Sequence, residues 1–198
     1  MRLAAPGVVA IALLTACTSE RLSPPKATTT QAIGATPQTN SSLICGFIPS
    51  EAAEIVTGTA ASNLQGQGQI RDKRYDHVIQ AACDVTLEKS GETLMGAGII
   101  NVQSASARDV EQRMKNLAPG DQLLSAPLRG LVTSEQHIRP DGQKTERPIA
   151  SLFWGEWLIE ASIEVPATGR DARQDAIDLT QQIAHALTLS PTAPTPAP

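Results

Sequence analysis

Two stretches of this sequence are predicted to form β-hairpins, and no other feature constrains the fold as strongly. The first hairpin joins residues 77–87 to 93–103 through Ser90-Gly91, and the second joins 149–154 to 157–165 through Gly155-Glu156. A two-residue turn makes consecutive strands antiparallel and sets which residues face each other. The sequence therefore predicts an antiparallel sheet.

In the first hairpin, the expected register places Cys83 opposite Gly98 and Val85 opposite Gly96, on one apolar side. Glycine inside a strand often marks the close approach of another backbone. We expect the approaching segment to be the chain around Cys45. We prefer this structural explanation of the two glycines to a ligand-binding one.

In the second hairpin, Trp154 is expected to face Trp157 across the turn. The two rings either pack beneath a helix, which is the commoner arrangement, or form an exposed binding edge at the hairpin tip. The opposite side of the second strand carries Glu160, Ser162 and Glu164. We interpret the two glutamates as part of a solvated face rather than as a catalytic pair.

Three helices are predicted from apolar periodicity and capping residues. They run from Ser50, as N-cap, to Gly58; from Ser104 or Ser106 to about Leu117; and from Asp171 to about Leu189. The apolar stripe of the last helix comprises Ala176, Leu179, Ile183 and Leu187, and its polar residues, expected in solvent, are Asp175, Asp178, Gln182 and His185.

Strands linked as hairpins, together with these helices, predict an α+β domain. Its antiparallel sheet of hairpins would carry the helices mainly on one face. Residues 59–74 are rich in Gly, Gln and Asn and are expected to form a loop. Gly66-Gln67-Gly68 within it lacks the flanking residues that a phosphate-binding loop requires.

The N-terminal region carries a targeting pattern. Residues 3–14 are almost entirely apolar, and Leu14-Thr15-Ala16-Cys17 closes the run. The run is shorter than the roughly 20 residues that span a bilayer as a helix, and it suits a signal peptide over residues 1–16. The closing tetrapeptide resembles the bacterial lipoprotein signal. That resemblance implies a diacylglyceryl thioether on Cys17 and an anchor on the extracytoplasmic face of the cell membrane. An ordinary secretory signal with a chance cysteine is the alternative.

The sequence contains three cysteines. With Cys17 lipidated, Cys45 and Cys83 remain as a pair, and outside the cytoplasm such a pair most simply forms a disulfide. Two free thiols or a metal site are the alternatives, although no ligand-type residues lie near these positions in the pattern.

Composition divides the mature chain into three parts. Residues 17–42 hold the lipidated cysteine and a Thr/Ser/Pro-rich linker expected to be disordered, residues 43–190 form one domain, and residues 191–198 form a disordered Pro/Ala/Thr tail. The formal net charge is −4 at pH 7, without a run of Lys or Arg. This balance argues against a nucleic-acid partner.

The layout combines a lipobox, a Thr/Pro linker, a cysteine before a short Ser-Glu-Ala-Ala helix, a second cysteine in the first hairpin and a terminal amphipathic helix. It resembles the small cell-envelope lipoproteins of mycobacteria and other actinobacteria, many of which belong to cysteine-paired families of unknown function. It is also similar to the extracellular sensor domains of actinobacterial Ser/Thr kinases. The chain departs from that pattern because Asp84-Val85 replaces an aromatic after the second cysteine, and because a further cysteine pair is missing. The resemblance implies no functional residues beyond Cys17, Cys45 and Cys83.

No motif in the sequence indicates a reaction. His77, His137 and His185 lie in separate predicted elements, and neither Gly-x-Ser-x-Gly nor His-Glu-x-x-His occurs. We therefore predict no catalytic residue, metal or cofactor. The charged stretch 71–77 could meet an anionic group, but we favour a soluble loop.

We expect a membrane-tethered binding or accessory module that recognises an envelope lipid, a glycan or a membrane protein. The alternative is an envelope hydrolase whose active-site residues converge only in the fold.

Overall fold

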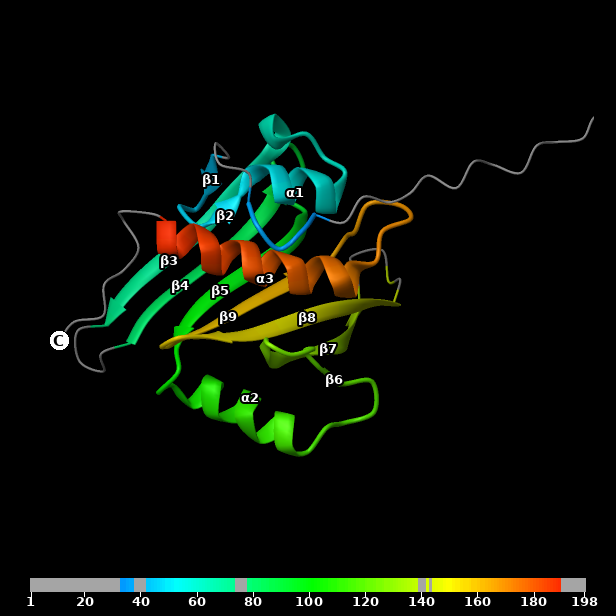
Figure 1. Ribbon diagram of the computed structural model, residues 1–198. Helices are drawn as coiled ribbons and strands as arrows, with labels where there is room; N and C mark the ends of the chain where they lie inside the picture. Colours follow the sequence, from blue (N-terminus) through cyan, green and yellow to red (C-terminus); the bar gives the residue numbers. More distant parts are fainter. Residues whose placement is uncertain (1–32, 38–41, 74–77, 139–141, 143, 190–198) are drawn as a thin grey trace, which may run out of the picture.

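The computed structural model describes residues 33–37, 42–73, 78–138, 142 and 144–189, and Figure 1 shows their arrangement. These residues contain a seven-stranded antiparallel sheet, a separate two-stranded sheet and three α-helices. In spatial order, the large sheet consists of β3 (Leu64–Lys73), β4 (Val78–Leu87), β5 (Thr93–Asn101), β9 (Trp157–Ile163), β8 (Lys144–Trp154), β7 (Arg129–Ile138) and β6 (Gln122–Leu123). The predicted α+β class with an antiparallel sheet is confirmed.

Two of the helices cover one face of the sheet, which we call the inner face. They are α1 (Ser50–Thr57) and α3 (Ala172–Leu189), and the small sheet of β1 (Leu43–Ile44) and β2 (Ile48–Pro49) lies beside α1 (Figure 1). The main core fills this layer, and its fully buried side chains include Val56, Val85, Ile159, Leu179 and Ile183. The expectation that the helices pack mainly on one face is therefore confirmed.

The third helix, α2 (Ala105–Lys115), packs on the opposite face, which we call the outer face. Ala107 of α2 joins Ile100, Phe153 and Leu158 in a second, smaller apolar cluster. Ser104 caps the helix as predicted, because its hydroxyl accepts a hydrogen bond of 3.1 Å from the Ala107 N–H. Phe153 and Leu158 interrupt the polar side of the second hairpin in the sequence. They do so because they pack against α2 in this cluster.

The first hairpin has a different register from the predicted one. The turn spans four residues, since the Leu87 N–H donates to the Glu92 carbonyl, and a bulge follows between Val85 and Thr86. Cys83 consequently faces Ala97, while Gly96 and Gly98 face Asp84 and Ala82. A one-residue slip moves a side chain to the other face of the sheet, so both glycines belong to the outer face and not to the apolar side.

The predicted loop at residues 59–74 is wrong over most of its length, because residues 64–73 form edge strand β3. Gly66 and Gly68 of this strand lie on the inner face, opposite Val85 and Cys83. The Cys45–Cys83 disulfide is formed, and Cys45 crosses β3 at these two glycines. The close approach that the sequence placed at Gly96 and Gly98 therefore occurs at Gly66 and Gly68.

The second hairpin has the predicted register, with Trp154 opposite Trp157 and Leu152 opposite Ile159. Gly155 at its turn has φ +58°, a left-handed conformation that favours glycine. Its first strand is longer than expected, since β8 begins at Lys144.

The helix boundaries agree with the sequence except at one cap. Helix α1 ends at Gly58, whose N–H bonds to the Glu54 carbonyl at 2.8 Å in a left-handed conformation. Ser50 is the first helical residue and not the N-cap; its hydroxyl instead bonds to the Ser42 hydroxyl at 2.7 Å. In the part of the chain that the structure describes, no helix is long and apolar enough to cross a membrane.

Candidate functional site

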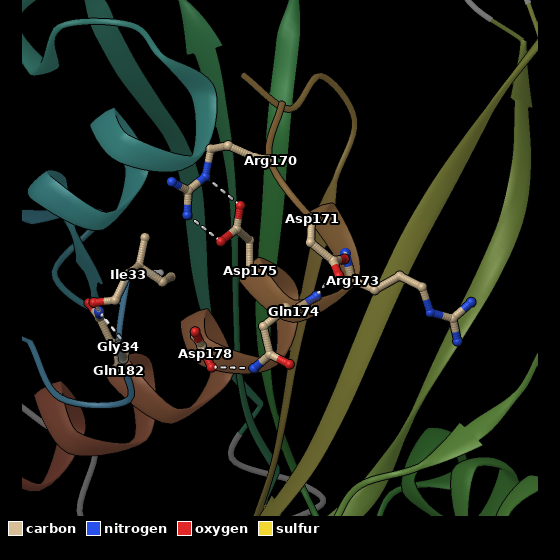
Figure 2. Close-up of polar contacts among 9 residues, drawn as sticks. All are labelled: Ile33, Gly34, Arg170, Asp171, Arg173, Gln174, Asp175, Asp178 and Gln182. Carbon is tan, nitrogen blue, oxygen red and sulfur yellow. Dashed lines mark hydrogen bonds and ion pairs between the residues drawn. The ribbon is translucent and has the colours of Figure 1, made fainter. Parts of the chain in front are cut away.

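Polar side chains gather at two places, one on each face of the sheet. The first lies around α3 and comprises Arg170, Gln174, Asp175, Asp178 and Gln182, together with the backbone of Ile33 and Gly34 (Figure 2). We call it the α3 clasp. The sequence placed its aspartates and glutamine in solvent, but Asp175, Asp178 and Gln182 are all buried. That expectation is wrong because the N-terminal segment and the loop before α3 cover the flank of the helix that carries these three residues.

The loop before α3 is held by a buried ion pair. Arg170 directs two nitrogens at the two carboxylate oxygens of Asp175, and its Nε lies 2.6 Å from Oδ2. Both side chains are less than one-tenth exposed. Asp171 caps the helix, since its Oδ1 accepts from the N–H groups of Arg173 and Gln174 at 3.0 and 3.2 Å. These contacts set the direction in which α3 leaves the loop.

The N-terminal segment is held by its backbone. The Gln182 amide donates to the Ile33 carbonyl at 3.0 Å and to the Gly34 carbonyl at 2.9 Å. Asp178 accepts a hydrogen bond from the Gln174 amide at 2.7 Å and another from the backbone of Gly34. Burial raises the pKa of the Asp178 carboxyl, the Gln174 bond opposes this, and the charge of Asp175 adds to it. The polar groups of the α3 clasp thus bind the chain's own backbone, and we interpret the clasp as structural.

The second cluster lies on the outer face and comprises Glu135, His137, Thr145, Arg147, Ser151, Glu160 and Glu164, from β7, β8 and the end of β9. We call it the outer carboxylate cluster. Strand pairing brings it together, because Glu135 faces Arg147 and Ser151 faces Glu160. Side chains at alternate positions of neighbouring strands share one face.

Glu160 is a carboxyl group with a perturbed pKa. Burial raises the pKa of its carboxyl, a 2.9 Å hydrogen bond from the Ser151 hydroxyl opposes the rise, and the charge of Glu135 adds to it. Ser151 itself is buried. The pair can therefore present either a carboxylate or a proton-donating carboxylic acid to a ligand above the sheet.

Glu164 is held by Arg147. The guanidinium donates to Glu164 Oε1 at 2.9 Å and to Glu135 Oε2 at 2.6 Å. Burial lowers the pKa of Arg147, but its bonds to Glu135 and Glu164 outweigh that effect and the pKa is raised, so the guanidinium stays charged. His137 Nδ1 lies 3.8 Å from Glu164 Oε2, beyond ordinary hydrogen-bond length.

Unused hydrogen-bonding capacity is concentrated here. The Glu164 side chain is only 9% exposed, yet its Oε2 atom has no hydrogen-bond partner among the described residues. Thr145 Oγ1 and Arg147 Nε, in the neighbouring strand β8, are likewise buried atoms without a hydrogen-bond partner among the described residues. Buried polar atoms are nearly always paired with protein, water or ligand. The outer carboxylate cluster therefore contains one acceptor, one donor and one hydroxyl that are buried without a hydrogen-bond partner among the described residues.

The outer face beside this cluster is open. Helix α2 packs near β5 and β7, whereas Gln65, Gln67, Ala82 and Asp84 on the outer side of β3 and β4 are exposed. Between these strands and the cluster lie Gly96 and Gly98 of β5, and the side chains of Asp84 and Ser162 lie close to Gly96. The surface is polar and carries several carboxylates.

The other predicted site residues lie elsewhere. Trp154 and Trp157 point to the inner side, half-buried against the main core, and Trp154 meets the His185 ring edge-on at 5.4 Å between centroids. They do not join the outer carboxylate cluster. Cys17 and His77 lie outside the described residues, and so does part of the charged stretch 71–77, whose first three residues belong to β3.

The sequence analysis placed Glu160 and Glu164 on a solvated face, which is wrong for Glu164 because it is buried beside Arg147. It missed Arg147, Ser151 and Glu135. The alternation Thr145, Arg147, Ile149, Ser151 before the tryptophan hairpin could have indicated their common face. Among the described residues, no group of three or more His, Cys, Asp and Glu side chains is arranged to hold a metal ion. Comparisons with protein families, with curated proteins and with solved structures find no match to this chain.

Proposed function

We propose that this chain is a lipid-anchored module on the extracytoplasmic face of the cell membrane that binds a glycan of the cell envelope. The anchor is Cys17, at the end of the lipobox Leu14-Thr15-Ala16-Cys17. The Cys45–Cys83 disulfide supports this location, because disulfides persist in oxidising compartments outside the cytoplasm. The pairing of Cys45 with Cys83 also leaves Cys17 as the thiol available for lipid.

The binding surface is the outer sheet face, and one observation carries this assignment. Glu164 is a buried carboxylate whose Oε1 accepts a hydrogen bond from Arg147, whereas Oε2, 3.8 Å from His137 Nδ1, has no hydrogen-bond partner among the described residues. An unpaired buried acceptor costs about 1–3 kcal/mol, and a ligand hydroxyl would remove that cost. Sugar hydroxyls suit the outer carboxylate cluster because each both donates and accepts, which matches its mixture of carboxylates, hydroxyls and the Arg147 guanidinium.

The alternative function, an envelope hydrolase, has one observation in its favour. Glu160 has a raised pKa, as a general acid requires. Glu160 and Glu164, however, are four residues apart on one strand, which separates their Cα atoms by about 13 Å. Glycosidases hold their two carboxyl groups about 5–9.5 Å apart, and here Arg147 already engages Glu164. Binding without turnover is therefore the function we favour.

The test uses the full chain and soluble fragments of cell-wall polysaccharide and peptidoglycan as probes, with affinity measured by calorimetry. Glu164→Gln keeps the shape but removes the charge, and we expect it to weaken binding about tenfold or more, since charge-assisted hydrogen bonds contribute about 1.5–3 kcal/mol. Glu146→Gln, at an exposed position on the inner side of the same sheet, is the matched control.

Equal binding by wild type and Glu164→Gln would overturn the assignment of this face. Release of new reducing ends from a polysaccharide probe, abolished by Glu160→Gln, would establish the hydrolase instead.

A further inference from the structure

Among the described residues, strand β3 is one of the two edges of the large sheet. It is the outermost strand beyond β4, and it pairs with β4 over ten consecutive residues without a bulge. Gly66 and Gly68 are exposed even though Cys45 covers their inner side. Because glycine has no side chain, this exposed surface is backbone. Between Leu64 and Gly68 the strand has none of the lysines, prolines or bulges that usually protect an edge.

The sequence of this edge is self-complementary. Residues 64–70 read Leu-Gln-Gly-Gln-Gly-Gln-Ile, which is the same pattern from either end, with Gln67 at its centre. An antiparallel partner of identical sequence, related by a two-fold axis at Gln67, places Gly66 opposite Gly68 and position 65 opposite position 69. The glycines are already required by Cys45, but the symmetric placement of the glutamines around them is not.

We propose that β3 is a dimerisation edge, which pairs antiparallel with β3 of a second copy of this chain and joins the two large sheets into one. On the inner side, glycine meets glycine across the axis. No side chain from the partner's strand therefore enters the layer that Ile44 and Cys45 occupy over Gly66 and Gly68. On the outer side, the exposed Gln67 meets its own copy, and two amides hydrogen-bond to each other without a charge penalty.

A second copy fits this edge better than an unrelated strand does. Only a partner with the same spacing of glycines matches the inner layer, and a two-fold axis makes that match automatic. The pairing places the outer faces of two molecules side by side, with Gln65 and Gln67 at the seam and Asp84 one strand away on β4. The inference does not depend on which ligand the outer face binds.

The test introduces single cysteines into the full chain in its membrane, followed by mild oxidation and mass spectrometry of the linked peptides. At the axis, the two Cα atoms of Gln67→Cys would be about 4.5–5.5 Å apart, within the range that a disulfide needs. In Gln65→Cys, the cysteines of the two copies would be offset by four residues along the strands, or about 13 Å. We expect Gln67→Cys to give about tenfold more linked dimer than Gln65→Cys, because only the first geometry permits the bond.

Gln122→Cys, on β6 at the other edge of the sheet, controls for random collision. Sedimentation of the wild-type chain in detergent, compared with Gln67→Lys, is an independent measurement. Two like charges at the axis should weaken self-association about tenfold. Equal cross-linking at positions 65, 67 and 122, a wild type that stays monomeric at the highest concentration, or a link from position 67 to a different protein would each overturn the proposal.

Discussion

The Cys45 sulfur lies directly above Gly68, 2.7 Å from the position that a Cβ atom on that residue would take. The same sulfur is 2.8 Å from the corresponding position at Gly66. The disulfide to Cys83 thus passes over β3 to reach β4, and two glycines give it room. This crossing ties the chain before α1 to the edge of the sheet.

Gly68→Ala should therefore destabilise the fold. The new methyl group would meet the Cys45 sulfur and, at 3.0 Å, the Ala82 carbonyl, neither of which belongs to a flexible side chain. Overpacking of this kind costs about 1–3 kcal/mol. The measurement is the free energy of unfolding in denaturant. At Gly98, the nearest atom would be 3.8 Å away, so Gly98→Ala should be neutral or stabilising by up to about 1 kcal/mol. The reverse ranking would contradict the crossing at β3.

Reduction of the disulfide should lower stability substantially. Cys45 and Cys83 are 38 residues apart in sequence, and the loss of loop-closure entropy for a loop of that length corresponds to about 4 kcal/mol. Thermal unfolding of wild type with and without reductant measures this effect, and Cys45→Ser/Cys83→Ser should match the reduced protein. Non-reducing peptide mapping should recover the linked pair. An unfolding temperature that does not change with reductant would contradict a stabilising role for the disulfide.

The effect of Glu160 on stability should depend on pH. Its pKa in the folded protein is raised above the value of about 4.5 expected in the unfolded chain, so the folded state keeps this proton to higher pH. The stability that protonated Glu160 contributes is fully present below the unfolded pKa and is lost as pH rises through the raised pKa.

Glu160→Gln cannot titrate, so its stability relative to wild type should increase between about pH 4.5 and the raised pKa. The increase is about 1.4 kcal/mol for each pH unit by which the two pKa values differ. Unfolding curves at pH 4, 5.5 and 7 measure it. A difference between the proteins that stays constant across pH would show that burial does not perturb this carboxyl.

The buried pair of Arg170 and Asp175 should be sensitive to loss of one partner. Asp175→Asn removes the carboxylate that holds both nitrogens of Arg170, and loss of one partner of a buried ion pair costs about 3–5 kcal/mol. Arg170→Met/Asp175→Leu removes both charges and should recover much of that loss, because buried ion pairs replaced by apolar groups are often neutral. Chemical unfolding of the three proteins completes the comparison. A double variant that is no more stable than Asp175→Asn would contradict coupling between the residues.

Gln182→Ala should release the N-terminal segment from α3. The change deletes the hydrogen bonds to the carbonyls of Ile33 and Gly34, each with a net contribution of about 0.5–1.5 kcal/mol. Hydrogen exchange at residues 33–37 should accelerate more than exchange in α3 itself. Gln181→Ala, at a half-buried position of the same helix, is the control. Unchanged protection of the segment in Gln182→Ala would mean that other contacts hold it.

Several elements were predictable because their causes are local. The turn at Gly155-Glu156 sets its own register, the Ser104 cap starts α2, and Gly58 ends α1 through its left-handed conformation. In each case a few neighbouring residues decide the geometry. The cysteine count also predicted the disulfide, since a pair remained once Cys17 was assigned to lipid.

Other features were decided by contacts between distant parts of the chain. Strand β3 has little side-chain alternation to predict it, because the glycines that form it are selected by Cys45 from another segment. A bulge between Val85 and Thr86 shifted the first hairpin by one residue and so moved Gly96 and Gly98 to the outer face.

Contacts between distant parts of the chain also decided the burial of the two polar clusters. Periodicity places Asp175, Asp178 and Gln182 off the apolar stripe of α3, which is correct. It carries no information that a segment 149 residues away, at Ile33, would cover that side and supply backbone partners for them. Similarly, Glu164 became buried and half-paired only when three strands brought Arg147 and Glu135 beside it. The sequence by itself determined the Gly155-Glu156 turn, the caps at Ser104 and Gly58, the helices and the disulfide pair. Tertiary packing decided strand register and the burial of charge, because both depend on which distant surfaces meet.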